Sequence, residues 1–433
     1  MSELGTIIEG EVTALAFGGQ GIIRHEGFVV FVPYTTPGDR VKCRITQKKS
    51  SFAHAELIDV ITPSTQRTTP KCPYYGTCGG CQLQHIEYAA QLESKRQWIE
   101  DALKRIGGLT TISVPSVIPS KQQWMYRRHI TLALRPNEST VDVGYYAVDN
   151  RSLISVVYCP IFNDSSDEII PQVRDIASQL KCGPADAGKV SIFKREAGKY
   201  LIHFQFEFLP KNSAQVFDRV LQRFSNWSGV LVSAPKKTIA YGDSTDLLHV
   251  ETLAFKYSPQ VFIQNNSEQS GNIYREICRL VDSMHAKKVL DLYCGIGISS
   301  ILLAKQGRDV LGIETNPAAI QYAKENAVMN SATACFQVGS VQTVLPKILR
   351  QESFDAVIVN PPRTGMDPRV VTALLQRAPK ELIYISCMPA TLARDLRLLN
   401  ASGKGYEVVA CQGFDMFPQT AHVETVVHLK LCG

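Results

Sequence analysis

Apolar and polar residues alternate in short runs along the first sixty positions of the chain. Phe28–Val32 and Ala53–Leu57 are two such runs, and alternation with a period of two is typical of half-buried β-strands. Turn-forming residues such as Gly18–Gly21 separate the runs. We therefore expect residues 1–62 to form a small OB-like β-barrel, a fold that often binds single-stranded nucleic acid through a basic face. Four basic residues could supply that face or simply form a solvated surface: Lys42, Arg44, Lys48 and Lys49.

The middle of the chain changes pattern twice. Residues 63–70 are rich in Thr, Ser and Pro, which favours a linker, and residues 88–106 carry apolar side chains at helical spacing before two glycines. Strand patterns then return, as in His129–Leu134. We expect residues 63–260 to form a central, mostly β domain. The basic pair that leads into its first strand, and that could contact RNA phosphates, is Arg127 and Arg128.

The last third alternates strand and helix patterns, which indicates a parallel sheet covered on both faces. We expect residues 261–433 to form a Rossmann-like α/β domain. Its first strand runs into a turn with Gly295 and Gly297, which let the backbone approach a ligand closely, and the next strand ends at Glu314, an acid suited to ribose hydroxyls. A dinucleotide fingerprint would place another glycine where Ser300 stands, so this turn fits S-adenosylmethionine better than NAD.

Two further strand patterns end in a polar or reactive residue. Val357–Val359 is followed by Asn360, and Leu382–Ser386 is followed by Cys387. In a doubly wound sheet the carboxyl ends of the strands form the edge where ligands bind, so both residues should lie on one rim with the glycine turn. A thiol at that rim could be a nucleophile, although a free cysteine is more often a small buried apolar residue.

Composition places few limits on function. The 433 residues suffice for two or three domains, and 45% apolar with 20% charged residues indicates a folded, soluble protein. The first residues lack the pattern of a signal peptide, and no apolar run approaches the length that crosses a membrane. We therefore expect a cytoplasmic protein with no membrane partner. A net charge of +6 allows a nucleic-acid partner without requiring one.

Twelve cysteines in a chain without an export signal favour metal binding or catalysis over a disulfide framework. Cys72, Cys78 and Cys81 lie within ten residues, with glycines between them that let the sulfurs converge, and Cys159 could be a fourth ligand. This spacing fits an iron–sulfur cluster better than a zinc site, whose cysteines usually come in close pairs. A metal-free arrangement, with Cys159 merely buried, is the third alternative.

The motifs together resemble the bacterial RNA uracil-5-methyltransferases, and among them the iron–sulfur-containing enzymes that make 5-methyluridine in 23S rRNA. The resemblance covers nearly the whole chain and implies that the N-terminal barrel is a TRAM domain. Besides the cysteine segment, the glycine turn and the residues around Cys387, it rests on three stretches: Phe262–Asn266, Ala390–Asp395 and Asp415–Glu424. The transfer RNA relatives lack the cysteine cluster and the barrel, which favours ribosomal RNA as the substrate.

The resemblance also implies the chemistry and the residues that perform it. Cys387 would add to C6 of a uridine flipped out of the RNA, C5 would take the methyl group of S-adenosylmethionine, and Glu424 would remove the C5 proton. Phe262 would contact the RNA, the four cysteines would hold an iron–sulfur cluster of the [4Fe–4S] type, and a monomer would suffice. The implied cofactor positions are Gln264, Tyr293, Gly295, Gly297, Glu314, Ser340 and Asn360.

Three positions depart from the family pattern. Asn360 stands where Asp is usual, Met388 follows the nucleophile where Asn is usual, and Ile298 replaces a commonly polar residue. An Asn-Pro-Pro segment also occurs in methyltransferases that act on exocyclic amines, which is a second hypothesis for this chain. A third hypothesis is an RNA-binding assembly protein that has lost the cofactor. The amine-methylating hypothesis leaves Cys387 and Glu424 without a role.

Overall fold

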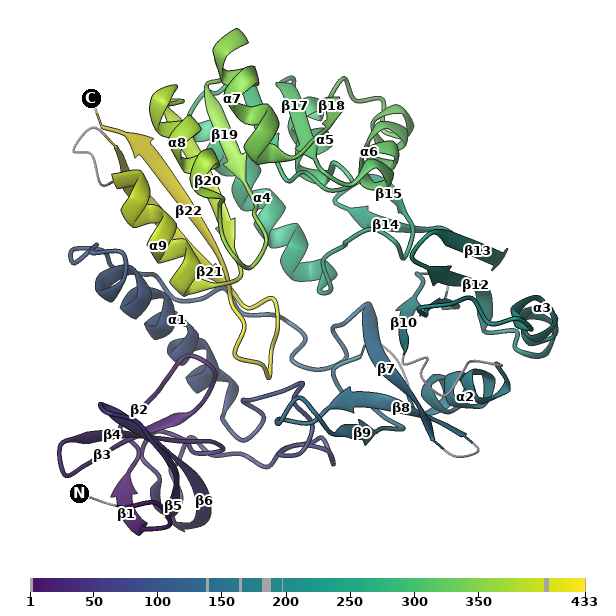
Figure 1. Cartoon of the computed structure of the whole chain (residues 1–433). Coiled ribbons are helices and arrows are strands. Elements are labelled where there is room, and N and C mark those ends of the chain that lie inside the picture. The colour runs from purple at the N-terminus through teal and green to yellow at the C-terminus, as the bar shows by residue number, and fades with distance from the viewer. Residues whose placement is uncertain are drawn as a thin grey trace.

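The computed structural model describes residues 3–137, 140–162, 166–180, 188–196, 198–400 and 405–432. Three parts follow one another along the chain (Figure 1): a small β-structure at the N-terminus, a central sheet with two helices, and an α/β layer structure at the C-terminus. In the described part of the chain, no helix combines the length and the apolar character needed to cross a membrane.

The N-terminal part is a six-stranded sheet that curls on itself, so that its strands β1 and β3 also contact each other. Its core consists of the alternate residues of each strand, for example Val41, Cys43 and Ile45, all at most 3% exposed. This is the barrel that the period-two pattern predicts. The strands are β1 (Ile7–Glu11), β2 (Ala14–Leu15), β3 (Gly21–His25), β4 (Phe28–Val32), β5 (Arg40–Lys48) and β6 (Phe52–Thr62).

Helix α1 (Tyr88–Arg105) connects the barrel to the C-terminal part (Figure 1). At one end the indole Nε1 of Trp98 donates a hydrogen bond to the Leu15 carbonyl of the barrel at 2.8 Å. On the other side the helix packs on α9 (Pro389–Asn400). The helix therefore covers the span that the apolar spacing predicts, and it contacts both ends of the chain.

The central part is a seven-stranded, mostly antiparallel sheet of order β13-β12-β11-β10-β7-β8-β9. Two helices that the sequence did not lead us to expect, α2 (Ser166–Gln179) and α3 (Ser213–Arg223), pack on it through apolar stripes. A separate hairpin, β14 (Asp246–Val250) and β15 (Leu253–Tyr257), leads on to the C-terminal part. The sheet strands are β7 (His129–Asn137), β8 (Thr140–Tyr146), β9 (Leu153–Ser155), β10 (Gly188–Lys194), β11 (Tyr200–Gln205), β12 (Trp227–Ala234) and β13 (Lys237–Gly242).

The C-terminal part is a seven-stranded sheet of order β18-β17-β16-β19-β20-β22-β21 with helices on both faces (Figure 1). Alternate residues of each central strand enter two different cores, as Leu290 and Val289 do, so the sheet is buried on both sides. The strands are β16 (Lys288–Leu292), β17 (Asp309–Glu314), β18 (Cys335–Val338), β19 (Ala356–Val359), β20 (Glu381–Ser386), β21 (Tyr406–Phe414) and β22 (Glu424–Leu431). The other helices are α4 (Ser267–Ser283), α5 (Ile298–Lys305), α6 (Pro317–Met329), α7 (Val341–Gln351) and α8 (Pro368–Gln376).

Strand direction determines what lies at the functional edge of this sheet. Strands β16 to β20 are parallel, so their carboxyl ends meet at one edge, whereas β22 is antiparallel to β20. An antiparallel strand begins where its parallel neighbour ends. Glu424, the first residue of β22, therefore lies at the same edge as the residues that follow β16, β17, β19 and β20.

Candidate active site

The glycine turn after β16 has the backbone conformations that a close ligand approach requires. Tyr293, Gly295 and Gly297 all have positive φ, at 63°, 56° and 82°. A Cβ on Gly297 would lie 2.8 Å from the Phe336 ring, whereas a Cβ on Gly295 would meet nothing within 4 Å. Gly297 is thus required for packing, and the space above Gly295 is open. Positive φ at the bulky Tyr293 is a strained conformation of the kind that concentrates at functional sites.

Two carboxylates hold this turn in place. The Oδ2 of buried Asp291 accepts hydrogen bonds from the hydroxyls of Ser299 and Ser300, each at 2.6 Å, and burial raises the pKa of Asp291 to about 6. Ser300, which stands where a dinucleotide fingerprint has glycine, therefore anchors the start of α5. Glu314 accepts from the backbone N–H of Gly295 at 3.3 Å and of Asn316 at 2.8 Å, which orients its carboxylate at the rim.

A pocket opens beside the turn. Three of the residues predicted to bind the cofactor, Gln264, Tyr293 and Asn360, line it together. Gly295 follows the lining residue Cys294 and donates its backbone N–H to Glu314, and neither Gly295 nor Glu314 lines the pocket itself. Ser340 follows β18 as the N-cap residue of α7, at the same sheet edge. The other lining residues come from α4, from β16 with the turn and helix that follow it, and from the ends of β19 and β20: Ser270, Ile273, Tyr274, Ile277, Asp291, Cys294, Ser299, Ile358 and Ile385.

Cys387 and Glu424 face each other at this edge. Ser386 pairs with Thr425 in the antiparallel ladder between β20 and β22, so the residues next in register are Cys387 and Glu424. Burial and then the nearby Glu424 raise the pKa of the Cys387 thiol to about 11, while Arg363 acts in the opposite direction. Glu424 is 6% exposed, and burial raises its pKa to about 8 although Arg363 lowers it. The charge of Glu424 thus raises the pKa of the Cys387 thiol, and Arg363 lowers the pKa values of both groups.

Two buried polar atoms near this pair have no hydrogen-bond partner among the described residues. They are the Nδ1 of His422 and the Oγ1 of Thr425, which lie two residues before and one residue after Glu424. Buried polar groups are nearly always satisfied in folded proteins. His422 Nδ1 is thus an unsatisfied buried atom close to Glu424 in the chain, whereas Thr425, the next residue of the strand, points to the opposite face of the sheet.

The four cysteines of the predicted cluster line one cavity. Cys72, Cys78, Cys81 and Cys159 surround it together with Arg127. The backbone N–H of Gly80 donates to the Cys78 sulfur at 3.4 Å, and the Tyr145 hydroxyl donates to the Cys159 sulfur at 3.6 Å. Burial raises the pKa of Cys81 to about 12 and also raises the pKa values of Cys72 and Cys78.

This arrangement differs from a site for a single ion. Among the described residues, no group of three or more His, Cys, Asp or Glu side chains could hold one metal ion. A cubane cluster spaces its four sulfurs more widely, because each sulfur binds a different iron atom. The four thiols share one cavity, and an N–H and an O–H donor reach two of the sulfurs, those of Cys78 and Cys159.

The residues predicted to contact RNA lie in very different environments. Phe262 is 76% exposed. Arg128 is buried and pairs with Glu196 at 3.2 Å and with Asp246 at 3.9 Å, so its charge is directed into the protein. Arg127 lines the cysteine cavity, and its Nε has no hydrogen-bond partner among the described residues. Of the three, Phe262 alone presents its side chain openly to a partner.

Sequence comparison matches this chain to known families along most of its length. Residues 2–58 match the TRAM domain, residues 252–384 the methyltransferase small domain, and residues 342–431 the tRNA (uracil-5-)-methyltransferases. A protein of Protochlamydia amoebophila described as an uncharacterized RNA methyltransferase is 48% identical over 98% of both chains. A protein of Halalkalibacterium halodurans with the same description is 32% identical over 98% of this chain and 97% of its own. The chain belongs to the RNA uracil-5-methyltransferase family.

One solved structure of the family is similar over the whole length. The tRNA (uracil-54, C5)-methyltransferase of Pyrococcus abyssi, in complex with S-adenosyl-L-homocysteine, has a TM-score of 0.75 and 27% identity, and the match covers 97% of this chain and 99% of that one. The present chain is accordingly an S-adenosylmethionine-dependent RNA methyltransferase. The pocket at the glycine turn, lined by Gln264, Tyr293 and Asn360, lies at the carboxyl edge of the sheet, the edge at which ligands bind in such folds.

Sequence reasoning did not identify some residues of this site. Arg363 follows the Pro361-Pro362 segment that marked the end of β19, so its position at the rim could have been inferred. His422 lies inside a stretch that carried the family resemblance, and the resemblance pointed to Glu424 alone. Lys95, fully buried in α1, gives no local signal, because its partner Asp415 lies 320 residues further along the chain.

Proposed function

We propose that this enzyme transfers a methyl group from S-adenosylmethionine to C5 of a uridine in RNA, with Cys387 as nucleophile and Glu424 as base. The observation that carries the proposal is the register of β20 and β22, which puts the thiol and the carboxylate opposite each other at the edge that also forms the donor pocket. Among the hypotheses considered, only methylation of uracil C5 uses both the thiol and the carboxylate. In the amine-methylating alternative neither group has a function.

The chemistry begins at C6 of the base. Uracil C5 is a poor nucleophile, so Cys387, after losing its proton, adds its sulfur to C6 and places electron density on C5. S-Adenosylmethionine supplies the methyl group that C5 takes up. The pKa of this thiol is raised to about 11 in the free protein. The positive charge of Arg363 next to the thiol acts in the opposite direction and favours formation of the thiolate.

Glu424 completes the cycle. C5 now carries a methyl group and a proton, and the carboxylate removes that proton, so the C5–C6 double bond re-forms and the C6–sulfur bond breaks with release of the Cys387 thiolate. A carboxyl with a pKa of about 8 is suited to this step, because a base works best when its pKa lies near the working pH. The same carboxyl would be far too weak a base at its ordinary value.

We propose 23S rRNA as the substrate and tRNA as the second candidate. The cysteine cavity supports the first, because it is the feature that the iron–sulfur-containing rRNA enzymes share. The match to the Pyrococcus abyssi enzyme, which is named for tRNA, covers 97% of this chain and so spans both the barrel and the cysteine segment, which is why tRNA remains the second candidate. Phe262, exposed at the rim, offers a face on which a flipped or neighbouring base could stack.

The test is methyl transfer in vitro followed by nucleoside mass spectrometry. Fragments of 23S rRNA and tRNA transcripts are each incubated with isotopically labelled S-adenosylmethionine, and the digests are searched for labelled 5-methyluridine. We expect the label in 5-methyluridine from rRNA and none with Cys387→Ala. Label in a methylated amino group, unaffected by Cys387→Ala, would instead establish the amine-methylating alternative. Absence of both transfer and S-adenosylmethionine binding, measured by calorimetry, would establish the RNA-binding protein that has lost the cofactor.

We also propose that Cys72, Cys78, Cys81 and Cys159 hold a [4Fe–4S] cluster. The support is the cavity that the four thiols share and the N–H and O–H donors that reach the sulfurs of Cys78 and Cys159. Iron and acid-labile sulfide should be found at about four each per chain after anaerobic purification, and Cys159→Ser should lower both. A chain that binds zinc with no sulfide would refute this assignment.

A further inference from the structure

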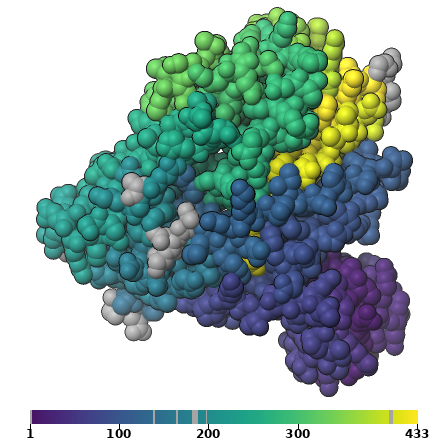
Figure 2. Space-filling view, turned by 180° about the vertical axis from the view of Figure 1, so that it is seen from behind, coloured from purple at the N-terminus to yellow at the C-terminus, as the bar shows by residue number. Residues whose placement is uncertain are grey.

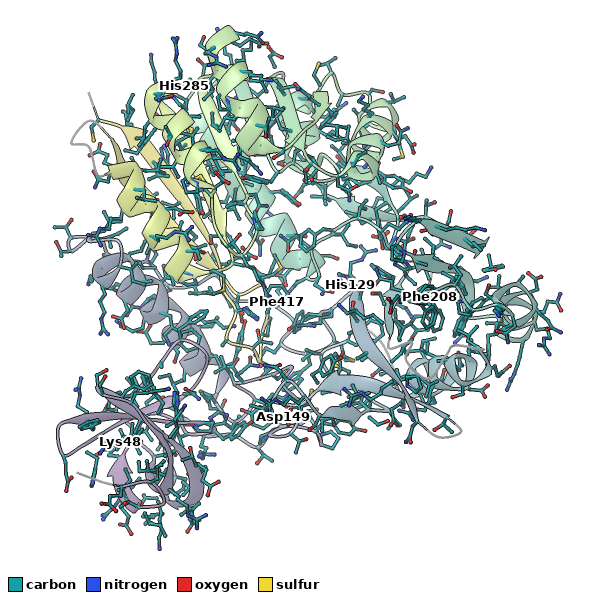
Figure 3. All side chains as sticks on the ribbon, in the orientation of Figure 1. Lys48, His129, Asp149, Phe208, His285 and Phe417 are labelled. Carbon is teal, nitrogen blue, oxygen red and sulfur yellow. The ribbon has the colours of Figure 1, made fainter. Side chains whose placement is uncertain are left out.

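The segment that carries the chain from β21 to Glu424 leaves the C-terminal sheet. Asp415–Val423 forms a loop that reaches down between α1 and β7, and Phe417 marks it in Figure 3. Seen from behind, a small area of yellow C-terminal residues emerges among blue residues of the first half of the chain (Figure 2). The base at position 424 is therefore delivered by a loop whose surroundings come largely from elsewhere in the chain.

One face of α1 holds the start of this loop. The Lys95 ammonium donates to Asp415 Oδ1 at 2.5 Å and to the Phe417 carbonyl at 3.1 Å, and the side chains of Lys95 and Asp415 are both 0% exposed. The Tyr88 hydroxyl donates to the other Asp415 oxygen at 2.8 Å. Tyr88 and Lys95 are two turns apart on α1, so they approach Asp415 from the same side of the helix.

The same face also holds the middle of the loop. Gln91, between Tyr88 and Lys95 on α1, donates through Nε2 to Gln419 Oε1 at 3.0 Å and accepts the Gln419 backbone N–H at 3.1 Å. From the other side the backbone N–H groups of Gln82 and Leu83 donate to the Gln419 carbonyl at 3.1 and 3.0 Å. The amide of Gln82 accepts the Ala421 N–H at 3.2 Å. Both sides of the loop are thus fixed up to three residues before Glu424.

A fully buried ion pair needs a reason other than stability. Taking a lysine and an aspartate out of water costs several kcal/mol per ion, and apolar pairs of similar volume often serve a fold as well or better. An ion pair instead fixes the conformation of the loop. Only one arrangement lets the Lys95 ammonium donate to both the Asp415 carboxylate and the Phe417 carbonyl. The element that this arrangement places is the strand start at Glu424, nine residues after Asp415.

We propose that Lys95 is a positioning residue for Glu424, acting through Asp415 and the Phe417 carbonyl to set the loop that delivers the base. The proposal rests on the proposed function, in which Glu424 removes the C5 proton. It assigns Lys95 no contact with RNA or the methyl donor. Addition of Cys387 and methyl transfer to C5 precede the step that needs Glu424. A displaced Glu424 should therefore leave those two steps in place and slow the elimination.

The experiment compares Lys95→Met with the unsubstituted enzyme in a single turnover on substrate RNA. The covalent protein–RNA adduct is followed on denaturing gels. We expect the adduct to form at the normal rate and to decay ~100-fold more slowly, as a misplacement of about 1 Å can cost, with unchanged Kd values for RNA and methyl donor. Lys104→Met is the matched control, because Lys104 lies on the same helix and pairs at the surface with Glu100. Decay at the normal rate in Lys95→Met would overturn the proposal.

A second variant excludes a simple folding defect. Lys95→Met alone leaves the Asp415 carboxylate buried without its partner, which destabilises the folded chain. Lys95→Met combined with Asp415→Asn removes both charges and keeps the volume, so it should fold. We expect this folded double variant to retain the slow decay, and decay at the normal rate would show that the pair only balances charge. If the unsubstituted enzyme forms no 5-methyluridine in the same assay, the proposed function has failed, independently of Lys95.

Discussion

The pH dependence of the elimination step follows from the burial of Glu424. Burial raises the pKa of this carboxyl from its ordinary 4.5 to about 8, which corresponds to a cost of about 5 kcal/mol for the charged form. The base must be charged to accept the C5 proton. At pH 7 only about a tenth of the molecules carry the carboxylate, since the pH is one unit below the pKa. The elimination should therefore accelerate about tenfold per pH unit up to pH 8 and level off above it.

The assay separates this step from the others. Enzyme, RNA and methyl donor are mixed at pH values from 6 to 10, samples are quenched, and the formation and decay of the covalent adduct are fitted separately. Decay should follow a single titration with a midpoint near 8. A decay rate that is constant between pH 6 and pH 9 would refute the reasoning, because a carboxyl with an ordinary pKa is fully charged over that whole range.

The same pKa makes a prediction about stability. The unfolded chain releases the Glu424 proton near pH 4.5 and the folded chain near pH 8, so the folded state loses stability as the pH rises between these values and no further above them. Glu424→Gln removes this loss. Denaturant unfolding should show similar stabilities at pH 4.5 and a variant that is more stable at pH 8.5, by up to about 5 kcal/mol. Equal stabilities at pH 8.5 would contradict the burial argument.

Three other changes test the surroundings of the site. Phe262→Ala should weaken RNA binding by ~1–3 kcal/mol in filter-binding assays, as loss of one stacking ring does, with donor binding by calorimetry unchanged. Asn360→Asp restores the charge usual in the family. It should raise the ratio of the affinity for S-adenosylmethionine to that for S-adenosylhomocysteine about fivefold, since one exposed charge pair contributes up to about 1 kcal/mol. Gly297→Ala places a Cβ 2.8 Å from Phe336 at a φ of +82° and should abolish donor binding or lower stability by about 1–2 kcal/mol.

Much of the cofactor side of the site could be predicted because it depends on local pattern and strand direction. Gly295, Gly297 and Asn360 follow strands and Glu314 ends one, and the carboxyl ends of parallel strands must meet at one edge. No local sequence pattern predicts that β22 runs antiparallel to β20, although this direction is what brings Glu424 to that edge. Its position came from the family resemblance alone.

The RNA side was harder to predict because charge in a sequence does not reveal burial. Arg128 looked available for phosphates, yet its partners Glu196 and Asp246 come from segments far along the chain. Arg127 looked equivalent to Arg128 and lies instead in the wall of the cysteine cavity. Neighbouring residues at a strand start point to opposite sides, so two adjacent arginines meet different environments.

The most direct test of the central claim is to trap the nucleophile. RNA that carries 5-fluorouridine at the target has no C5 proton for Glu424 to remove, so the adduct formed by Cys387 cannot be resolved after methyl transfer. Mass spectrometry of the digested protein–RNA adduct should find the methylated, fluorinated nucleotide on the peptide that contains Cys387. An adduct on another residue, or 5-fluorouridine RNA that is bound without any covalent adduct while ordinary RNA is methylated, would contradict the account.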